Sequence, residues 1–311
     1  MNNIIFAGFS IFSYIILKNL LKNNIKITAV IYPKKNNTID NIDSKYSIIK
    51  LATMYKINTH QIENLSDNNI VNLIKNLTPS LIIVASYGNI FPSKILEIPL
   101  IGCINIHASL LPKWRGASPI QQAILNNNKY TGITIIIMNK NIDEGTLIYK
   151  KICPIKYCNT NFQLNIKLAY IASKMILKNI NNLLNKNFTK FIQNTNLVSY
   201  AHKIKKFDGI INWKNSAIKI TKQLQAYYNW PFIFTYLKKN YIQIIEATIF
   251  INSILYKYGQ IIKKHKNGIY ISTNKNIIII KKYKIEGKKT INTKILNDTN
   301  KLILGFFFIN T

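Results

Sequence analysis

Cysteine is scarce in this chain of 311 residues, which limits how it can be held together. There are three cysteines, Cys103, Cys153 and Cys158, an odd number without zinc-type spacing. That pattern favours free, buried thiols in a reducing cytosol over a disulfide framework. It implies no metal site and predicts a cytoplasmic protein.

Long apolar runs are also missing. A membrane-spanning helix needs at least about 18 uncharged apolar residues in a row, and the sequence has no such run. The N-terminal stretch MNNIIFAGFSIFSYIILKNLL is apolar, but it lacks a basic n-region, and Lys18 and Lys22 fall at its far end. We interpret it as strand, tight turn and helix, and we expect no membrane partner.

Glycine is sparse, and the nucleotide-binding glycine pattern is absent. No G-x-G-x-x-G follows the first apolar run, where the sequence reads FAGFS. That turn alone cannot cradle a pyrophosphate, so a dinucleotide site is disfavoured.

Acidic residues are few, with 11 against 42 basic ones, which gives a formal net charge of +31. Every basic residue is lysine except Arg115. Residues 201–311 hold 20 lysines and four acids, nearly twice the charge density of residues 1–200. This distribution favours a polyanionic partner, such as nucleic acid, bound by the C-terminal part. The alternative is a merely solvated lysine surface.

The pattern of apolar residues predicts alternating strands and helices in the first two thirds of the chain. Strands are expected at Asn3–Ala7, Lys26–Tyr32, Leu81–Ala85, Gly102–Ala108 and Gly132–Met138, with a hairpin partner at Leu147–Ile152. Helices are expected at Ile11–Leu21, Lys45–Tyr55 behind a Ser44 cap, Asp67–Lys75, Ala117–Leu125, Asn161–Leu184 and Ser216–Tyr228. This order is typical of an open α/β sheet. Short β-branched runs after residue 228 predict a small barrel or sandwich.

Three polar side chains interrupt this apolar pattern near strand ends. Asn105 and His107 lie two apart in CINIHAS, so in a strand they project from one face. Asp143 follows the apolar run that ends at Met138. An amide and an imidazole can stabilise an oxyanion, and a carboxylate can take charge as a proton leaves. The trio therefore suits carbonyl chemistry, although three satisfied polar groups at strand ends would explain it too.

The same residues belong to a longer pattern. NIHASLLPKWRGASPIQQAI resembles the signature of the folate-dependent formyltransferases, an Asn-x-His pair followed by Ser-Leu-Leu-Pro and then Arg-Gly-x-x-Pro. IDEGTLIYKK resembles the family's later Asp-x-Gly segment, and VASYGNIFPSKIL the strand and turn flanking the folate pocket. VSYAHKIKKFDGIINW and AYYNWPFIF resemble the junction into the second domain of members that formylate initiator tRNA.

The resemblance implies an α/β fold: an open, mostly parallel, Rossmann-like sheet domain followed by a small OB-like β-barrel domain. Residues 1–188 would form the formyltransferase catalytic domain, residues 189–206 a linker, and residues 207–311 a C-terminal OB-like domain that binds tRNA. We expect a monomer.

The resemblance also implies the chemistry. The donor would be 10-formyltetrahydrofolate and the acceptor the amine of methionyl-initiator tRNA, without a metal or a covalent enzyme intermediate. Asn105 and His107 would stabilise the oxyanion while Asp143, through water or His107, assists proton removal. The folate-contacting turn would consist of Ser109, Leu110, Leu111 and Pro112.

Arg115 stands inside this signature. A guanidinium is a rigid fork of five donors that lysine cannot reproduce, so a lysine-rich chain would keep arginine where the fork is used. We interpret it as a tie from the loop after Pro112 to carbonyls or a phosphate. The alternative is the chance survival of one arginine.

Three departures from the family pattern are visible. The family's loop after the second strand is glycine-rich and carries an arginine, whereas the loop over residues 32–46 has neither and contains two aspartates. Lys34, Lys35 and Lys45 could still reach phosphates there. The first turn reads GFSIF without the usual proline, and Asn212 stands where an aspartate is common.

Two other functions remain open from the sequence. One is a formyltransferase acting on a nucleotide-sugar amine, which shares the Asn-x-His and SLLP motifs. The other is a non-catalytic RNA-binding remnant. The basic C-terminal third favours tRNA over a small acceptor, and the presence of all three polar groups favours an enzyme over a remnant. A purine-pathway formyltransferase would need little beyond the first domain.

Overall fold

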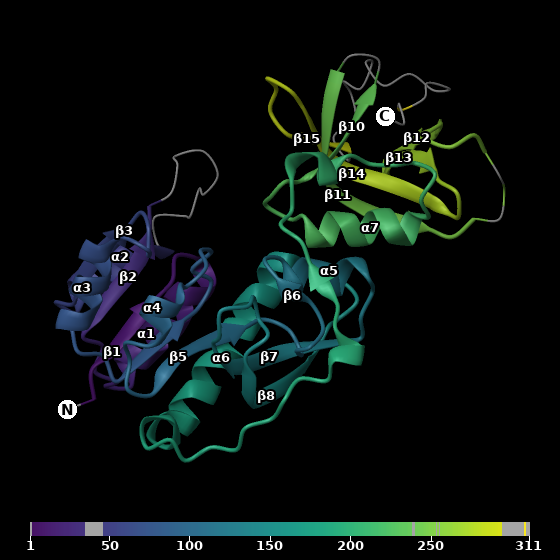
Figure 1. The fold of residues 1–311 in the computed structure, drawn as a ribbon. Coiled ribbons are helices and arrows are strands. Elements are labelled where there is room, and N and C mark those ends of the chain that lie inside the picture. Colours follow the sequence, from purple (N-terminus) through teal and green to yellow (C-terminus); the bar gives the residue numbers. More distant parts are fainter. Residues whose placement is uncertain are drawn as a thin grey trace. The chain divides into compact units, whose positions relative to one another are not determined.

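The computed structural model describes residues 2–34, 46–237, 240–252, 254, 256–293 and 308. The chain forms two compact units (Figure 1). The first comprises Met1–Ala123, Lys129–Ile155 and Gln163–His202, and the second comprises Ile124–Asn128, Lys156–Phe162 and Lys203–Thr311.

The first unit is built on a seven-stranded sheet in the order β3-β2-β1-β4-β5-β7-β8. Its strands are β1 (Ile4–Ala7), β2 (Ala29–Pro33), β3 (Asn58–Ile62), β4 (Leu81–Val84), β5 (Gly102–His107), β7 (Tyr130–Ile137) and β8 (Thr146–Pro154). The first five pair in parallel, whereas β7 is antiparallel to both β5 and β8. This mostly parallel sheet confirms the predicted fold class.

Continuous apolar runs form the central strands because both faces of the sheet are covered. All four residues of β1 and of β4 are buried. Ile5 and Ala7 share a core with Val71 and Ile74 of α3 (Asn68–Asn76). The alternate residues of β1 face the opposite side, as strand pleating requires. Helix α1 (Ile11–Lys22), which follows β1, also buries most of its apolar side chains.

Local side-chain caps set several helix starts. Ser10 accepts from the backbone N–H of Ser13 at the start of α1, and Asp67 caps α3. The helix predicted to start at Lys45 is α2 (Ile48–Met54), and its cap is Ser47. The Ser44 cap lies outside the described residues. Strand β3, with the polar sequence NTHQI, was not predicted.

The first unit contains further helices and short strands outside the seven-stranded sheet (Figure 1). They are α4 (Ser93–Leu96), β6 (Arg115–Gly116), α5 (Pro119–Leu125), α6 (Asn161–Leu184), the 3-10 helix η2 (Thr195–Leu197) and β9 (Tyr200–Ala201), of which α5 and α6 also extend into the second unit. Strands β6 and β9 pair in parallel. Residues 189–206, predicted as a linker, thus contain strand β9, which pairs with Arg115 and Gly116 in the loop after Pro112.

The second unit is a small antiparallel sheet with one main helix. Its strands are β10 (Ile233–Leu237), β11 (Asn240–Phe250), β12 (Ile261–His265), β13 (Gly268–Ser272), β14 (Ile277–Ile285) and β15 (Ile291–Asn292), preceded by η3 (Lys206–Gly209) and α7 (Ala217–Ala226). The strand order is β10-β11-β14-β13-β12, with β15 on β14. Trp213 is fully buried, stacks on Phe308 and donates to Thr235. This unit is the small β domain that the sequence predicted.

Three further observations bear on the class of protein. Across the described part of the chain, no helix is long and apolar enough to cross a membrane. Cys103 and Cys153 are buried free thiols as predicted, but Cys158 is exposed, so its burial was predicted wrongly. No group of three or more His, Cys, Asp or Glu side chains suited to a metal ion occurs among the described residues.

Candidate active site

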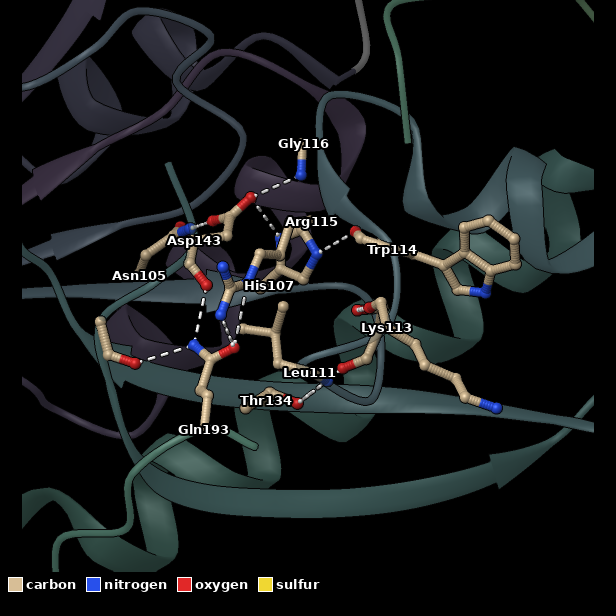
Figure 2. A network of polar contacts seen from close by, with 12 residues as sticks. Asn105, His107, Leu111, Lys113, Trp114, Arg115, Gly116, Thr134, Asp143 and Gln193 are labelled. Atoms are coloured by element: carbon tan, nitrogen blue, oxygen red, sulfur yellow. Dashed lines mark hydrogen bonds and ion pairs between the residues drawn. The ribbon is translucent and has the colours of Figure 1, made fainter. Parts of the chain in front are cut away.

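Strand β5 presents Asn105 and His107 on one face, as their spacing predicted, and the loop after β7 brings Asp143 to them (Figure 2). Because β7 is antiparallel to β5, its last residues lie beside the start of β5, where Met138 N–H donates to the carbonyl of Cys103. The loop must therefore fold back over the sheet to deliver Asp143.

The Asp143 carboxylate is the centre of the cluster. Its Oδ1 accepts from Asn105 Nδ2 at 2.9 Å, and its Oδ2 lies 3.4 Å from His107 Nδ1. Oδ2 also accepts from the backbone N–H of Gly116 at 2.8 Å. Both the imidazole and the carboxylate are almost fully buried, with side-chain exposures of 6% and 8%. Burial strengthens these electrostatic contacts because little water screens them.

His107 is held from its other side as well. Its Nε2 lies 2.9 Å from the carbonyl oxygen of Trp114. A carbonyl oxygen only accepts, so Nε2 carries a proton in this arrangement. Trp114 has a φ of +63° and Asp143 a φ of +55°, values that L residues disfavour. Backbone strain of this kind gathers at sites where the surrounding structure enforces it.

Side chains of strands β7 and β8 form hydrogen bonds with the backbone of the Ser109–Pro112 turn. Thr134 Oγ1 donates to the carbonyl of Ser109 and accepts from the N–H of Leu111, at 2.7 and 3.1 Å. Lys150 Nζ donates to the carbonyl of Leu111 at 2.6 Å, and burial lowers the pKa of that lysine. The strand register places His107 opposite Thr134, and Thr134 opposite Lys150. The turn is therefore fixed to β7 and β8, and β7 is the direct neighbour of the strand that carries the imidazole.

The side chains of this turn are mostly turned inward. Ser109 and Leu111 are fully buried, and Ser109 Oγ donates to the carbonyl of Lys113 at 2.6 Å. Pro112 is buried and Leu110 is half-buried. Contact of these four residues with folate stays a prediction.

Arg115 binds the side chains of Glu144 and Gln193, and Figure 2 shows its contact with Gln193. The sequence suggested backbone carbonyls or a phosphate as its partners, and a phosphate contact stays a prediction. Arg115 Nη1 lies 2.7 Å from Glu144 Oε1, while Nε and Nη2 donate to Gln193 Oε1 at 3.2 and 3.0 Å. Sequence reasoning missed Gln193. It stands in the polar segment KFIQNTN, where nothing in the pattern separates one amide from its neighbours.

The altered loop contributes one described lysine. Lys34 Nζ lies 2.7 Å from Glu63 Oε2, and both side chains are largely exposed. Lys35 and Lys45 lie outside the described residues. The Lys34 ammonium carries three donors, so a phosphate would share it with Glu63.

A cavity of about 830 Å³ lies away from the trio. Thr78 and Pro79, just before β4, and Leu100, just before β5, contribute to its lining. These positions precede the strands, whereas His107 closes the carboxyl end of β5. The cavity therefore lies at the opposite edge of the parallel sheet and takes no part in the chemistry of the trio.

Comparison with known proteins gives the family of the chain. The sequence profile of the formyl transferase family matches residues 1–180, and the profile of its C-terminal domain matches residues 203–300. The chain belongs to the formyltransferase family.

Its curated relatives point to a particular member. The chain is 41% identical over 264 residues to the methionyl-tRNA formyltransferase of Blochmanniella floridana, with 82% of each chain covered. It is 38% identical over 304 residues to that of Buchnera aphidicola subsp. Baizongia pistaciae, covering 96% of this chain and 94% of the relative.

Solved structures share the fold at lower identity. An N-formyltransferase from Helicobacter canadensis, in complex with folinic acid and dTDP-3-aminofucose, has a TM-score of 0.69 and 23% identity, covering 90% of this chain and 99% of that one. HypX from Aquifex aeolicus, in complex with tetrahydrofolic acid, has a TM-score of 0.65 and 12% identity over 98% of this chain and 48% of that one. At these identities the likeness concerns the fold alone.

Proposed function

We propose that this chain transfers the formyl group of 10-formyltetrahydrofolate to the amine of methionyl-initiator tRNA, with Asn105, His107 and Asp143 as its catalytic groups. The assignment of these groups rests on one observation. The Asp143 carboxylate contacts both Asn105 and His107 in a buried cluster. Relatives 38% and 41% identical to the chain are methionyl-tRNA formyltransferases.

The donor groups suit a formyl carbonyl. Asn105 directs one N–H of its amide to Asp143, and its second N–H can donate to an oxygen that gains charge. The formyl oxygen competes with the carbonyl of Trp114 for the proton on His107 Nε2. Donors arranged in advance around a developing oxyanion contribute about 10²–10³-fold each to the rate.

The reaction follows as addition and elimination. The α-amine of the methionyl group attacks the formyl carbon and forms a C–N bond, while the carbonyl electrons move onto oxygen. Asn105 and His107 stabilise that oxyanion. Asp143, through water or His107, takes the proton that the attacking nitrogen must lose. The bond from the formyl carbon to folate N10 then breaks, and N10 receives a proton.

The turn at residues 109–112 is the proposed folate contact. Since the side chains of Ser109 and Leu111 are buried, the backbone of the turn and the half-buried side chain of Leu110 would face the ligand. Thr134 and Lys150 hold that backbone in place. A rigid turn loses little conformational freedom on binding.

We assign residues 1–188 to catalysis, 189–206 to a linker, and 207–311 to binding of the tRNA, in a monomer located in the cytoplasm. The lysines of residues 201–311 support the tRNA assignment because phosphates attract them. Release of counterions should make the affinity for tRNA fall steeply as salt rises. A flat salt dependence would mean that these lysines take no part.

The test is transfer of labelled formyl from 10-formyltetrahydrofolate to three acceptors: charged initiator tRNA, free methionine and a nucleotide-sugar amine. Transfer to the tRNA is expected to exceed transfer to the other two. Preference for the sugar amine would support the alternative acceptor. A folded protein that binds tRNA and transfers nothing would be the non-catalytic remnant.

A further inference from the structure

We propose that Arg115 and Gln193 are positioning residues that hold the loop carrying Asp143, and so set the carboxylate against Asn105. The inference rests on the proposed role of Asp143 in formyl transfer. Neither side chain needs to touch a substrate. Both act through the backbone and the neighbours of Asp143 (Figure 2).

Gln193 hydrogen-bonds to the backbone of the loop on both sides of Glu144. Its Nε2 donates to the carbonyls of Asp143 and Gly145, each at 2.8 Å. An amide nitrogen carries two hydrogens, so both of its donors are used. Gln193 is 6% exposed. Loss of its donors would leave the carbonyl of Gly145, the more buried of the two, without that hydrogen bond.

Arg115 fixes which way the Gln193 amide points. Its Nε and Nη2 both donate to Gln193 Oε1, so the oxygen faces the guanidinium and the nitrogen must face the loop. Its Nη1 binds Glu144, the residue next to Asp143. A lysine ammonium in place of this fork could not serve both partners in one plane.

Arg115 is itself held in place by its surroundings, so its contacts with Glu144 and Gln193 start from a fixed position. Its side chain is almost fully buried, its backbone N–H donates to the carbonyl of Ser199 at 2.9 Å, and it pairs with Tyr200 in the β6–β9 ladder. The next residue, Gly116, donates to the carboxylate of Asp143. The two-residue strand therefore holds both the loop and the carboxylate.

The loop requires such restraint because Asp143 has a φ of +55°. Aspartate adopts such a φ more readily than most L residues, but it still costs free energy, and the contacts around the loop help to maintain it. Released from Gln193, the loop can relax toward ordinary φ values and move the carboxylate away from Asn105. A displacement of about 1 Å at a catalytic group can lower a rate about 100-fold.

The experiment compares Gln193→Met and Arg115→Lys with the unaltered protein. Methionine keeps the length and flexibility of glutamine but has neither the amide donors nor the amide acceptor. We expect kcat for formyl transfer to fall about 10- to 100-fold in both variants, with KM for folate and for tRNA changed less than about 3-fold. Gln61→Met, at an exposed position on β3, is the matched control and should leave kcat unchanged.

The amide proton of Gly116 gives a readout that does not depend on the acceptor. It donates to the Asp143 carboxylate at 2.8 Å, and such charge-assisted bonds are short and strong. Its NMR signal should move upfield in Gln193→Met and in Arg115→Lys, in the same direction as in Asp143→Ala. It should not move in Gln61→Met.

The outcomes separate this inference from the proposed function. A fall in kcat with an unmoved Gly116 signal, or unchanged kcat in both variants, would overturn the positioning role. A moved signal in a protein whose unaltered form does not formylate tRNA would leave the positioning intact and refute the proposed function. If Gln193→Met does not fold, Arg115→Lys decides, since it retains the positive charge beside Glu144.

Discussion

Asn105 Nδ2 lies 2.9 Å from Asp143 Oδ1, although 38 positions separate the two residues. Helix α5, the antiparallel strand β7 and a folded-back loop intervene, so the contact exists only in the assembled sheet. This hydrogen bond orients both groups. It directs the amide nitrogen of Asn105 to Oδ1, and it leaves Oδ2 of Asp143 to contact His107 and Gly116. The chemistry of the site depends on that mutual orientation.

Thr134→Val should weaken both the fold and folate binding. Thr134 is fully buried and serves both the carbonyl of Ser109 and the N–H of Leu111. Valine has the same shape but leaves those two backbone groups unsatisfied, at a cost of about 2–3 kcal/mol. Chemical unfolding and the dissociation constant for folate measure the two effects.

The same strand offers a matched control in Thr131→Val. Thr131 is also buried, but its Oγ1 has no hydrogen-bond partner within the described parts of the chain. Its loss should change the free energy of unfolding by less than about 0.5 kcal/mol, or increase it. Equal destabilisation by the two variants would contradict the role given to Thr134.

Gly145→Ala should disturb the loop that carries Asp143. A Cβ at this position would lie 1.8 Å from the carbonyl oxygen of Ile137 and 2.9 Å from its carbonyl carbon, and strand backbone cannot give way as a side chain can. We expect kcat to fall about 100-fold and the free energy of unfolding to fall by about 1–3 kcal/mol.

Gly287→Ala provides the comparison for that glycine. Its φ is +73° and nothing lies within 4 Å of an added Cβ, so only the backbone conformation is penalised, by about 1–2 kcal/mol. Its kcat should stay within about 2-fold of the unaltered protein. Retained turnover in Gly145→Ala would show that the loop tolerates the displacement.

Tyr87→Phe should alter the alkaline stability of the protein. Burial raises the pKa of Tyr87 from 10.0 to about 12. Between these values the unfolded chain releases the proton first, so rising pH favours unfolding and stability is lost. Phenylalanine removes this dependence, and the variant should gain up to about 2 kcal/mol over the unaltered protein toward pH 12.

At pH 7 the same variant should be no less stable. The hydroxyl of Tyr87 is buried without a hydrogen-bond partner among the residues that the structure describes, and its ring packs edge-on against Phe91. Removing an unsatisfied hydroxyl costs little. Urea titrations at pH 7 and pH 11 measure both values. A loss above about 1 kcal/mol at pH 7 would mean that the hydroxyl has a partner.

Much of this architecture could be predicted because short-range physics determines it. The fully buried strands β1 and β4 have the continuous apolar runs that a covered parallel sheet requires. Asn105 and His107 could be placed on one face because strand side chains alternate. Strand β3 was missed because its sequence, NTHQI, is largely polar and only partly buried at the sheet edge.

The support around the trio could not be predicted for a different reason. Gln193 is one polar residue in an Asn- and Lys-rich segment. The pairing of β6 with β9 and the bridge between Phe191 and Leu147 bring that segment beside Arg115. The direction of β7 was also open, since an apolar run is compatible with either direction. Long-range pairing decides both, and local sequence does not encode it.

The most direct test of a trio acting together is a double-mutant cycle on formyl transfer to methionyl-initiator tRNA, with His107→Asn, Asp143→Asn and the double variant. Each single change should lower kcat at least about 100-fold in a folded protein. Because the groups serve one tetrahedral intermediate, the double variant should be no slower than about the worse single one. Full multiplication of the two effects, or a single variant that keeps its turnover, would contradict joint action on one formyl carbon.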